Sequence, residues 1–158
     1  MRTDQSTEEA VLIIGLYQER TTRKIMMPLT RSKAFNHPKW KIPGGGVEPG
    51  ESPIQAAKRE YHEENGLLVE NPYFVEVVRK PSRSDPSRIH IQHILVAQIQ
   101  NLIGFNKTAM DGDELLTNAI FDVNDIRQAM SHNVRLEGYE ILHFHISPLM
   151  RALEKIFG

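Results

Sequence analysis

The segment GGGVEPGESPIQAAKREYHEENGL, residues 44–67, constrains the fold more than any other stretch because it specifies both ends of one helix. Ser52 is a favourable N-cap, and Gln55 completes a capping box with it. Pro53 suits the first helical position, and Gly66 can adopt the left-handed conformation that follows a helix C-terminus. The sequence therefore predicts a helix that starts at Pro53 and ends just before Gly66, entered from a glycine-rich loop.

Three glutamates of this helix, Glu60, Glu63 and Glu64, lie on one stripe, next to the apolar stripe that would be buried. Like charges at these spacings destabilise a helix by roughly 0.2–0.5 kcal/mol per pair, and partial burial raises that cost. Arg59 can pair with Glu63, but one cation cannot neutralise three carboxylates and a phosphate-bearing ligand. The cluster therefore indicates a divalent cation, and hard carboxylate oxygens favour Mg²⁺ or Mn²⁺.

A solvated acidic face is the alternative interpretation of these glutamates, and most charge runs on helices are of that kind. The preceding loop favours a ligand site instead, because its glycines let the backbone approach a ligand closely and offer carbonyl groups to a metal. The residues that form this tight loop are Pro43, Gly44, Gly45, Gly46, Pro49 and Gly50.

The chain has 158 residues, of which 40% are hydrophobic, so it is long enough for one domain with its own core. Its formal net charge is −1, and we therefore do not expect nucleic acid or an anionic membrane as a partner. The absence of cysteine excludes disulfides and thiolate metal sites and suits a reducing compartment. The N-terminus lacks the pattern of a signal peptide, and we expect a cytoplasmic protein.

Alternating strands and helices predict a layered α/β or α+β fold. We expect a flexible tail over residues 1–8 and a single domain over 9–158. Pro28 cannot donate to a ladder, so its strand is predicted at an edge or bulged. Pro148 predicts a kink or a break in a helical segment over 139–157. Strands are expected over 10–18, 21–31, 36–43, 73–80, 88–100 and 118–122, and helices over 53–65 and from about 123.

The residues of the glycine loop and helix resemble the Nudix box, G-x5-E-x7-R-E-U-x-E-E-x-G-U. Tyr61 departs from the pattern, because a smaller aliphatic residue is usual there, and we expect altered packing rather than lost chemistry. The resemblance implies a Nudix-type α/β/α sandwich with a central mixed sheet. The matching residues are Gly45, Glu51, Arg59, Glu60, Glu63, Glu64, Gly66 and Leu67.

The resemblance also implies a pyrophosphohydrolase, which uses Mg²⁺ or Mn²⁺ to hydrolyse a nucleoside diphosphate linked to another moiety. Metal would be held by Gly45, Glu60, Glu63 and Glu64. Arg59 and Glu51 would orient the carboxylates. The general base would be a box glutamate or an acid from a distant loop, for which Asp113 and Glu114 are the candidates. The residues we expect to act in catalysis are thus Glu60, Glu63, Arg59 and Glu114.

The substrate is less well determined by the sequence. Arg79, Arg83 and Arg88 surround a proline-containing loop that favours ADP-ribose or nucleotide sugars as substrates, although a solvated basic loop fits equally. Trp40 and Phe35 precede the glycines and could stack on a base. The alternatives are a nucleoside triphosphate pyrophosphohydrolase, a sensor that binds nucleotide without turnover, and an enzyme acting on RNA 5′ ends. A homodimer is a further expectation from the family.

The seven histidines show no chelating pair. His90 and His93 point to opposite sides of a strand, and His143 and His145 are only two residues apart on a predicted helix. We therefore expect them to be exposed or to have structural hydrogen bonds, and a zinc site is not predicted.

Overall fold

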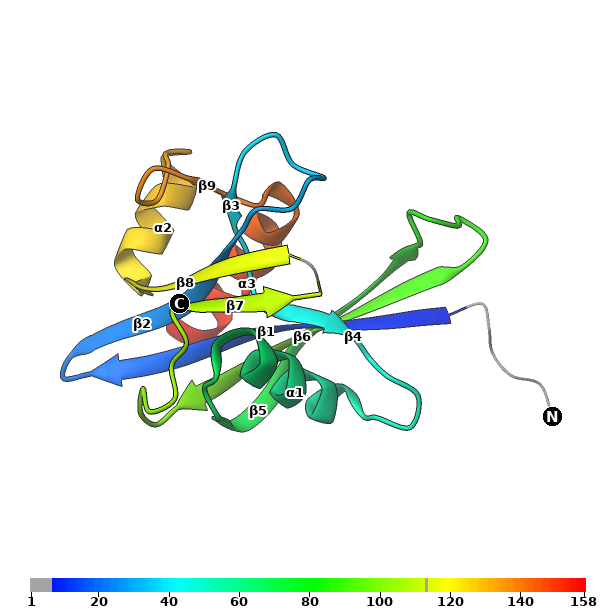
Figure 1. Cartoon of the computed structure of the whole chain (residues 1–158), viewed down its shortest axis with the longest axis horizontal. Helices are drawn as coiled ribbons and strands as arrows, with labels where there is room; N and C mark the ends of the chain where they lie inside the picture. The colour runs from blue at the N-terminus through cyan, green and yellow to red at the C-terminus, as the bar shows by residue number, and fades with distance from the viewer. Residues whose placement is uncertain (1–6, 113) are drawn as a thin grey trace.

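The computed structural model describes residues 7–112 and 114–158, and a mixed sheet with helices on both faces organises them (Figure 1). The strands of this part of the chain are β1 (Thr7–Glu19), β2 (Thr22–Thr30), β3 (Lys39–Trp40), β4 (Gly44–Gly46), β5 (Val69–Pro81), β6 (Ile89–Ile99), β7 (Thr108–Asp111), β8 (Glu114–Asp122) and β9 (Glu140–Ile141). The helices are α1 (Pro53–Asn65), α2 (Val123–Ser131) and α3 (His143–Phe157). The predicted layered fold with a mixed sheet is confirmed.

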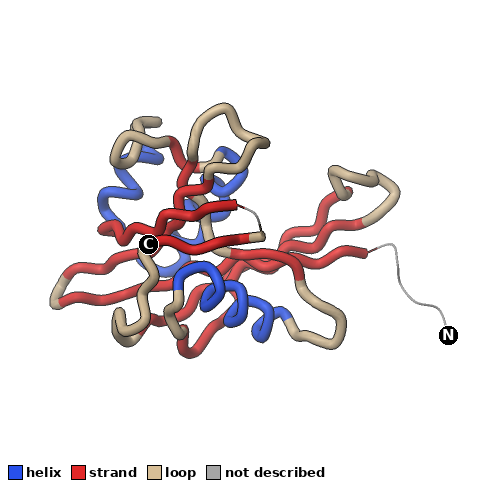
Figure 2. Tube along the Cα trace, in the orientation of Figure 1, coloured by secondary structure: helices blue, strands red, loops and turns tan. Residues whose placement is uncertain are grey.

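The strand β1 is the centre of the sheet, which Figure 2 shows as a continuous band of strands between helices. Along one edge it pairs in parallel with β6, and β6 pairs with β5. Its other edge is shared, because β4 pairs with its first half and β2 with its last residues. The opposite edge of β2 pairs with β8 from Lys24 to Thr30, and β3 pairs with β2 beyond the point where β2 leaves β1. The glycines of β4 are therefore held in the middle of the sheet, beside α1.

Alternate residues of β1 enter two separate cores. Val11 and Ile13 face α1 and pack with its buried residues, whereas Leu12 and Ile14 face α2 and α3. Because side chains alternate along a strand, the continuous apolar run of β1 serves both faces of the sheet. The fold is therefore a sandwich with α1 on one side and α2 and α3 on the other.

The ends of α1 have the predicted caps. Ser52 Oγ accepts a hydrogen bond of 3.1 Å from Gln55 N, and Gln55 Oε1 accepts one of 2.8 Å from Ser52 N. Gly66 adopts the left-handed conformation with φ of 77°. The helix boundaries predicted from the sequence are confirmed, so the orientation of the glutamates is fixed by local signals.

Tyr61 of α1 is fully buried against β1 at the position where the Nudix pattern has a smaller residue. The space for its ring comes from Gly15, since a Cβ there would lie 2.5 Å from Tyr61 Cζ. Its hydroxyl group has no hydrogen-bond partner among the described residues, and burial raises the pKa of the phenol. The departure at Tyr61 is therefore accommodated by a missing side chain on the neighbouring strand.

The end predicted for the N-terminal tail and the position predicted for the strand that contains Pro28 are both wrong. The tail expected over residues 1–8 extends too far, because Thr7 and Glu8 pair with Ile89 and His90 as part of β1; residues 1–6 lie outside the described part of the chain. The strand that contains Pro28 is not at an edge, since β8 pairs with it along that segment. The carbonyl of Pro28 accepts from Lys41 N, which places the proline nitrogen on the side that β1 has already left.

The C-terminal segment forms two elements rather than one helical stretch. β9 pairs in parallel with β3, and α3 then begins at His143 and continues through Pro148 to Phe157 without a break. The predicted break at Pro148 is therefore wrong, because Leu149, Ala152 and Leu153 keep this part of the helix packed in the core. None of the helices in the described residues has the length and apolarity that a membrane span requires.

The helix α3 also reaches the outer strand β5. Arg151 Nε lies 2.9 Å from Glu76 Oε2, and Lys155 Nζ donates a hydrogen bond of 2.7 Å to the carbonyl of Val75. Val75 lies at an irregularity in the pairing of β5 with β6, between the paired residues Phe74 and Glu76. The C-terminal helix is thus bound to the bulged part of the edge strand.

Candidate active site

The carboxylate of Glu60 faces the backbone of Gly45. Glu60 is 9% exposed on α1, and a Cβ on Gly45 would lie 2.5 Å from Glu60 Cδ. Only glycine at position 45 permits this approach. The structure therefore places the loop glycine and the first glutamate of the predicted metal set side by side.

Arg59 holds several carboxylates in position. Its guanidinium forms two contacts of 2.8 Å with Glu51, one of 2.9 Å with Glu60 Oε1 and one of 3.4 Å with Glu63 Oε2. It also donates to the carbonyl of Gly46 at 3.0 Å. The hydrogen bonds from Arg59 lower the pKa of Glu51 to about 2. This fork links the loop before α1 to the acidic stripe, as the predicted positioning role requires.

Glu64 is almost completely buried, with 1% of the residue exposed. Its Oε2 accepts from Gly44 N at 3.0 Å, and its Oε1 lies 3.3 Å from Lys41 Nζ. Lys41 Nζ also lies 3.3 Å from Asp111 Oδ2. Burial would lower the pKa of Lys41, but Glu64 and Asp111 outweigh that effect and raise it. Sequence reasoning missed Lys41, since nothing in its local pattern predicts contact with α1.

Burial raises the pKa of Glu64 to about 8, although Lys41 partly opposes this shift. Because the folded-state pKa exceeds the value of 4.5 for a free side chain, the folded protein binds this proton more tightly than the unfolded chain. The free energy of unfolding of the metal-free protein should therefore fall as the pH rises from about 4.5 to about 8.

Replacing Glu64 with Gln should remove that contribution to the pH dependence. Urea unfolding in EDTA at several pH values in this window, on the wild type and on Glu64→Gln, measures the difference. Parallel stability curves for the two proteins would contradict the assignment.

The ligand atoms predicted from the sequence are of the chemical type that Mg²⁺ and Mn²⁺ prefer. The oxygens of Glu60, Glu63, Glu64 and the Gly45 carbonyl are hard ligands on adjoining elements. Within residues 7–112 and 114–158, no three acidic or histidine side chains are already arranged around a common metal position. The carboxylates of Glu60 and Glu64 are paired with Arg59 and Lys41 respectively. Burial raises the pKa of both carboxyl groups.

The β7–β8 hairpin brings a distant acid to this region. Glu114 begins β8 and lines a cavity of about 360 Å³ together with Lys41, Gly44 and Gly45. Its negative charge also contributes to the raised pKa of Lys41. The other candidate base, Asp113, lies outside the described residues. Glu114 is therefore placed near the glycine loop, as a distant catalytic acid must be.

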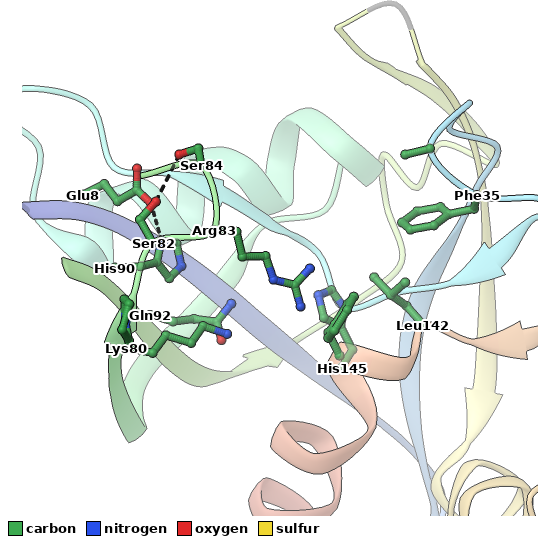
Figure 3. A pocket seen from close by; sticks show the side chains of 13 residues that line it. Glu8, Phe35, Lys80, Ser82, Arg83, Ser84, His90, Gln92, Leu142 and His145 are labelled. Atoms are coloured by element: carbon green, nitrogen blue, oxygen red, sulfur yellow. Dashed lines mark hydrogen bonds and ion pairs between the residues drawn. The ribbon is translucent and has the colours of Figure 1, made fainter. Parts of the chain in front are cut away.

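A second cavity, of about 520 Å³, adjoins the first (Figure 3). It lies between the β5–β6 loop and the first turn of α3. The two cavities share wall residues, so they form one continuous depression: the shared residues are Phe35, His90, Gln92, Leu142 and His145.

Of the three arginines expected to bind substrate, Arg83 alone lines this cavity. Its guanidinium carbon lies 3.5 Å from the ring centroid of Phe144. Arg79 is opposite the buried Ile91, and cross-strand neighbours share a face, so its side chain points to the other side of the sheet. Arg88 lies 3.6 Å from Glu8 and holds the start of β1. The predictions for Arg79 and Arg88 are therefore wrong for this cavity.

Trp40 does not reach the cavity either. Its side chain is buried, and its Nε1 donates a hydrogen bond of 2.7 Å to the carbonyl of Leu136. Its ring packs edge-on against the ring of Phe121, with 4.7 Å between the ring centroids. The prediction that Trp40 stacks on a base is wrong, because the ring belongs to the core. Phe35 and Lys80 do line the cavity, and Lys80 is opposite His90 in the register of β5 and β6.

Comparison with known proteins identifies the family. The model of the NUDIX domain matches residues 7–142. An RNA pyrophosphohydrolase of Francisella tularensis subsp. mediasiatica is 51% identical over 43 residues, which are 27% of this chain and 26% of that protein. The chain thus matches about a quarter of the length of this curated relative.

Solved structures share the fold across nearly the whole chain. The NUDIX domain of Shewanella oneidensis NrtR, in complex with ADP ribose, superimposes with a TM-score of 0.68 at 15% identity over 96% of this chain and 90% of that one. A NUDIX hydrolase from Nitrosomonas europaea gives 0.62 at 16% identity, over 94% and 89%. The family model spans most of the chain and the intact box lies within the matched region, so the chain belongs to the Nudix family.

Proposed function

We propose that this protein is a divalent-metal-dependent pyrophosphohydrolase that acts on a nucleoside diphosphate linked to another moiety. The observation that carries the proposal is the complete box, with Glu60 and Glu64 buried beside Gly44 and Gly45 at the wall of a cavity. A sensor that binds without turnover would not need all of these carboxylates.

The residues of the chain divide into distinct roles. Glu60, Glu63, Glu64 and the Gly45 carbonyl would hold Mg²⁺ or Mn²⁺, which neutralises diphosphate charge and activates water when bound. Arg59 keeps Glu60 and Glu51 oriented. Glu114 faces the same cavity from the opposite hairpin and is the candidate to accept the proton of the attacking water.

The larger cavity supports a substrate with a substantial group on the diphosphate. About 520 Å³ is within the range of small-molecule sites, and its walls combine the cations Lys80 and Arg83 with Phe35 and Phe144. ADP-ribose and nucleotide sugars carry such a group. The NrtR domain, whose structure contains ADP ribose, shares the fold, and ADP-ribose is therefore the first compound to test.

A second candidate function is the removal of phosphates from the 5′ end of RNA. It is favoured by the local similarity to the Francisella RNA pyrophosphohydrolase. The nearly balanced charge of this chain opposes it, since RNA-binding proteins usually present a basic surface.

A substrate panel tests the proposal. We expect ADP-ribose or a nucleotide sugar to be cleaved to a nucleoside monophosphate and a sugar phosphate with Mg²⁺ or Mn²⁺, and EDTA to stop the reaction. The panel also contains nucleoside triphosphates, dinucleoside polyphosphates and 5′-triphosphorylated RNA, with products identified by mass spectrometry. Cleavage of RNA alone would favour the second candidate, and no cleavage of any compound would refute the hydrolase.

A further inference from the structure

His145 lies at the junction of the two cavities. It belongs to the first turn of α3 and lines both the cavity beside Gly44 and Gly45 and the larger cavity that contains Arg83. Figure 3 shows its ring at the edge of the larger cavity, on the side toward which the Arg83 guanidinium points. His145 is therefore one of the five residues that both cavities share and that a ligand spanning them would lie among.

A backbone hydrogen bond determines which nitrogen of His145 carries the proton. Ile42 N lies 2.9 Å from His145 Nδ1. A backbone N–H can only donate, so Nδ1 must be the acceptor and must be unprotonated. In the neutral ring the proton then resides on Nε2. Ile42, just before the glycine loop, therefore fixes the tautomer of a residue in the first turn of α3.

The ring also remains neutral over a wide pH range. Burial lowers the pKa of His145 to about 4, and the positive charges of Lys41 and Lys80 act in the same direction. Protonation of Nδ1 would in addition break the bond from Ile42. His145 is thus a donor with one fixed direction, rather than a group that changes charge near neutral pH.

The donor at Nε2 has no acceptor within the described part of the protein, since the bond to Nδ1 is the only side-chain hydrogen bond of His145 there. The charged groups whose fields lower the pKa of His145 are cations, Lys41 in the wall of the first cavity and Lys80 in the wall of the second. Arg83 adds a third cation to these walls, and Glu8 and Glu114 are the carboxylates that line them. The junction therefore favours a ligand atom that accepts hydrogen bonds and carries negative charge.

We propose that His145 is a substrate-binding residue that donates from Nε2 to an oxygen of the substrate, on the sugar or phosphate next to the cleaved bond. The inference rests on the hydrolase function proposed above and names a specificity determinant for it. A neutral donor at this point selects oxygen-rich sugar phosphates over apolar groups of similar size. Because this histidine stays neutral near neutral pH, its contribution to substrate affinity should change little with pH there.

Mutation with a matched control tests the role of the side chain. His145→Leu should raise KM for the best substrate of the panel about tenfold, the loss of one hydrogen bond, while kcat changes less than about twofold. His145→Gln should restore most of the affinity, because its oxygen can accept from Ile42 and its nitrogen can donate. His143→Leu, on the exposed side of the same helical turn, should leave KM unchanged.

Nitrogen NMR on the wild type gives a readout that does not depend on turnover. Between about pH 5.5 and about pH 8.5, His145 should show an unprotonated Nδ1 and a protonated Nε2. Adding ADP-ribose in EDTA should shift the Nε2–H resonance. This measurement remains decisive if the leucine variant does not fold.

Two results would overturn the inference. The first is a proton on Nδ1. The second, in an active wild type, is an Nε2–H resonance that does not shift with ligand together with a KM that His145→Leu does not change. Failure of the hydrolase proposal has a different signature. In that case no substrate is cleaved, although the tautomer and the ligand-dependent shift are still observed.

Discussion

Glu64→Gln should reduce kcat/KM by about 100- to 1,000-fold, the usual cost of removing one group that organises transition-state charge. Glutamine keeps the shape of the side chain but offers one acceptor oxygen where the carboxylate offers two. Glu64 Oε1 and Oε2 both have partners, Lys41 Nζ and Gly44 N. The amide would therefore satisfy one of them at most and would be a poor ligand for a cation.

The same substitution should leave the fold intact. Burial already favours the protonated, neutral form of this carboxyl, since its pKa is raised to about 8. An exposed glutamate of β5 provides the matched control, because Glu70→Gln removes the same charge away from the site. Circular dichroism, thermal unfolding and steady-state kinetics with Mg²⁺ on the three proteins measure the effects. Unchanged turnover in Glu64→Gln would rule out a metal role for this residue.

The largest expected loss of stability follows Gly15→Ala, which should lower the free energy of unfolding by about 3 kcal/mol. The added Cβ would lie 2.5 Å from Tyr61 Cζ and 2.9 Å from Ile99 Cδ1, so the buried ring or the strand must move. Protein interiors are packed too densely to absorb this displacement without cost. Urea unfolding followed by fluorescence measures the change.

A double-mutant cycle shows whether the ring is the cause. Tyr61→Leu removes the atoms that clash, so Gly15→Ala should cost at least about 1 kcal/mol less in the Tyr61→Leu background than in the wild type. Tyr61→Phe removes a buried hydroxyl group that has no hydrogen bond within the described residues, and it should be neutral or stabilising. Additive effects of Gly15→Ala and Tyr61→Leu would exclude the proposed packing.

Local signals explain why parts of this fold were predictable from the sequence. The caps of α1 lie within a few residues of the helix, and the apolar run of β1 identifies a strand buried on both faces. The position of Pro28 was wrongly predicted, because its strand pairs with β8 on one side, while on the other side β1 has already left and the Pro28 carbonyl accepts from Lys41 N. That arrangement depends on where β1 and β2 diverge, which no local pattern contains.

The site residues also divide into those that local spacing predicts and those that depend on distant segments of the chain. The box residues were found because their spacing places them on one helix and one loop. The cavity residues come from segments far apart in the chain, and the strand register decided between Arg79 and its neighbour Lys80. Trp40 was misassigned because an aromatic residue beside a glycine loop can equally belong to the core. His145 became informative only when its contact with Ile42 was known.

The contact between α3 and β5 affects how two copies of the molecule can meet. An unprotected outer strand offers a ladder of free peptide groups to any similar strand, and many proteins aggregate in this way. Here Lys155 caps the carbonyl of Val75 at the bulge, and Arg151 adds a charged side chain beside it. Edge-to-edge growth of the sheet through this segment would require these two side chains of the C-terminal helix to release the strand first.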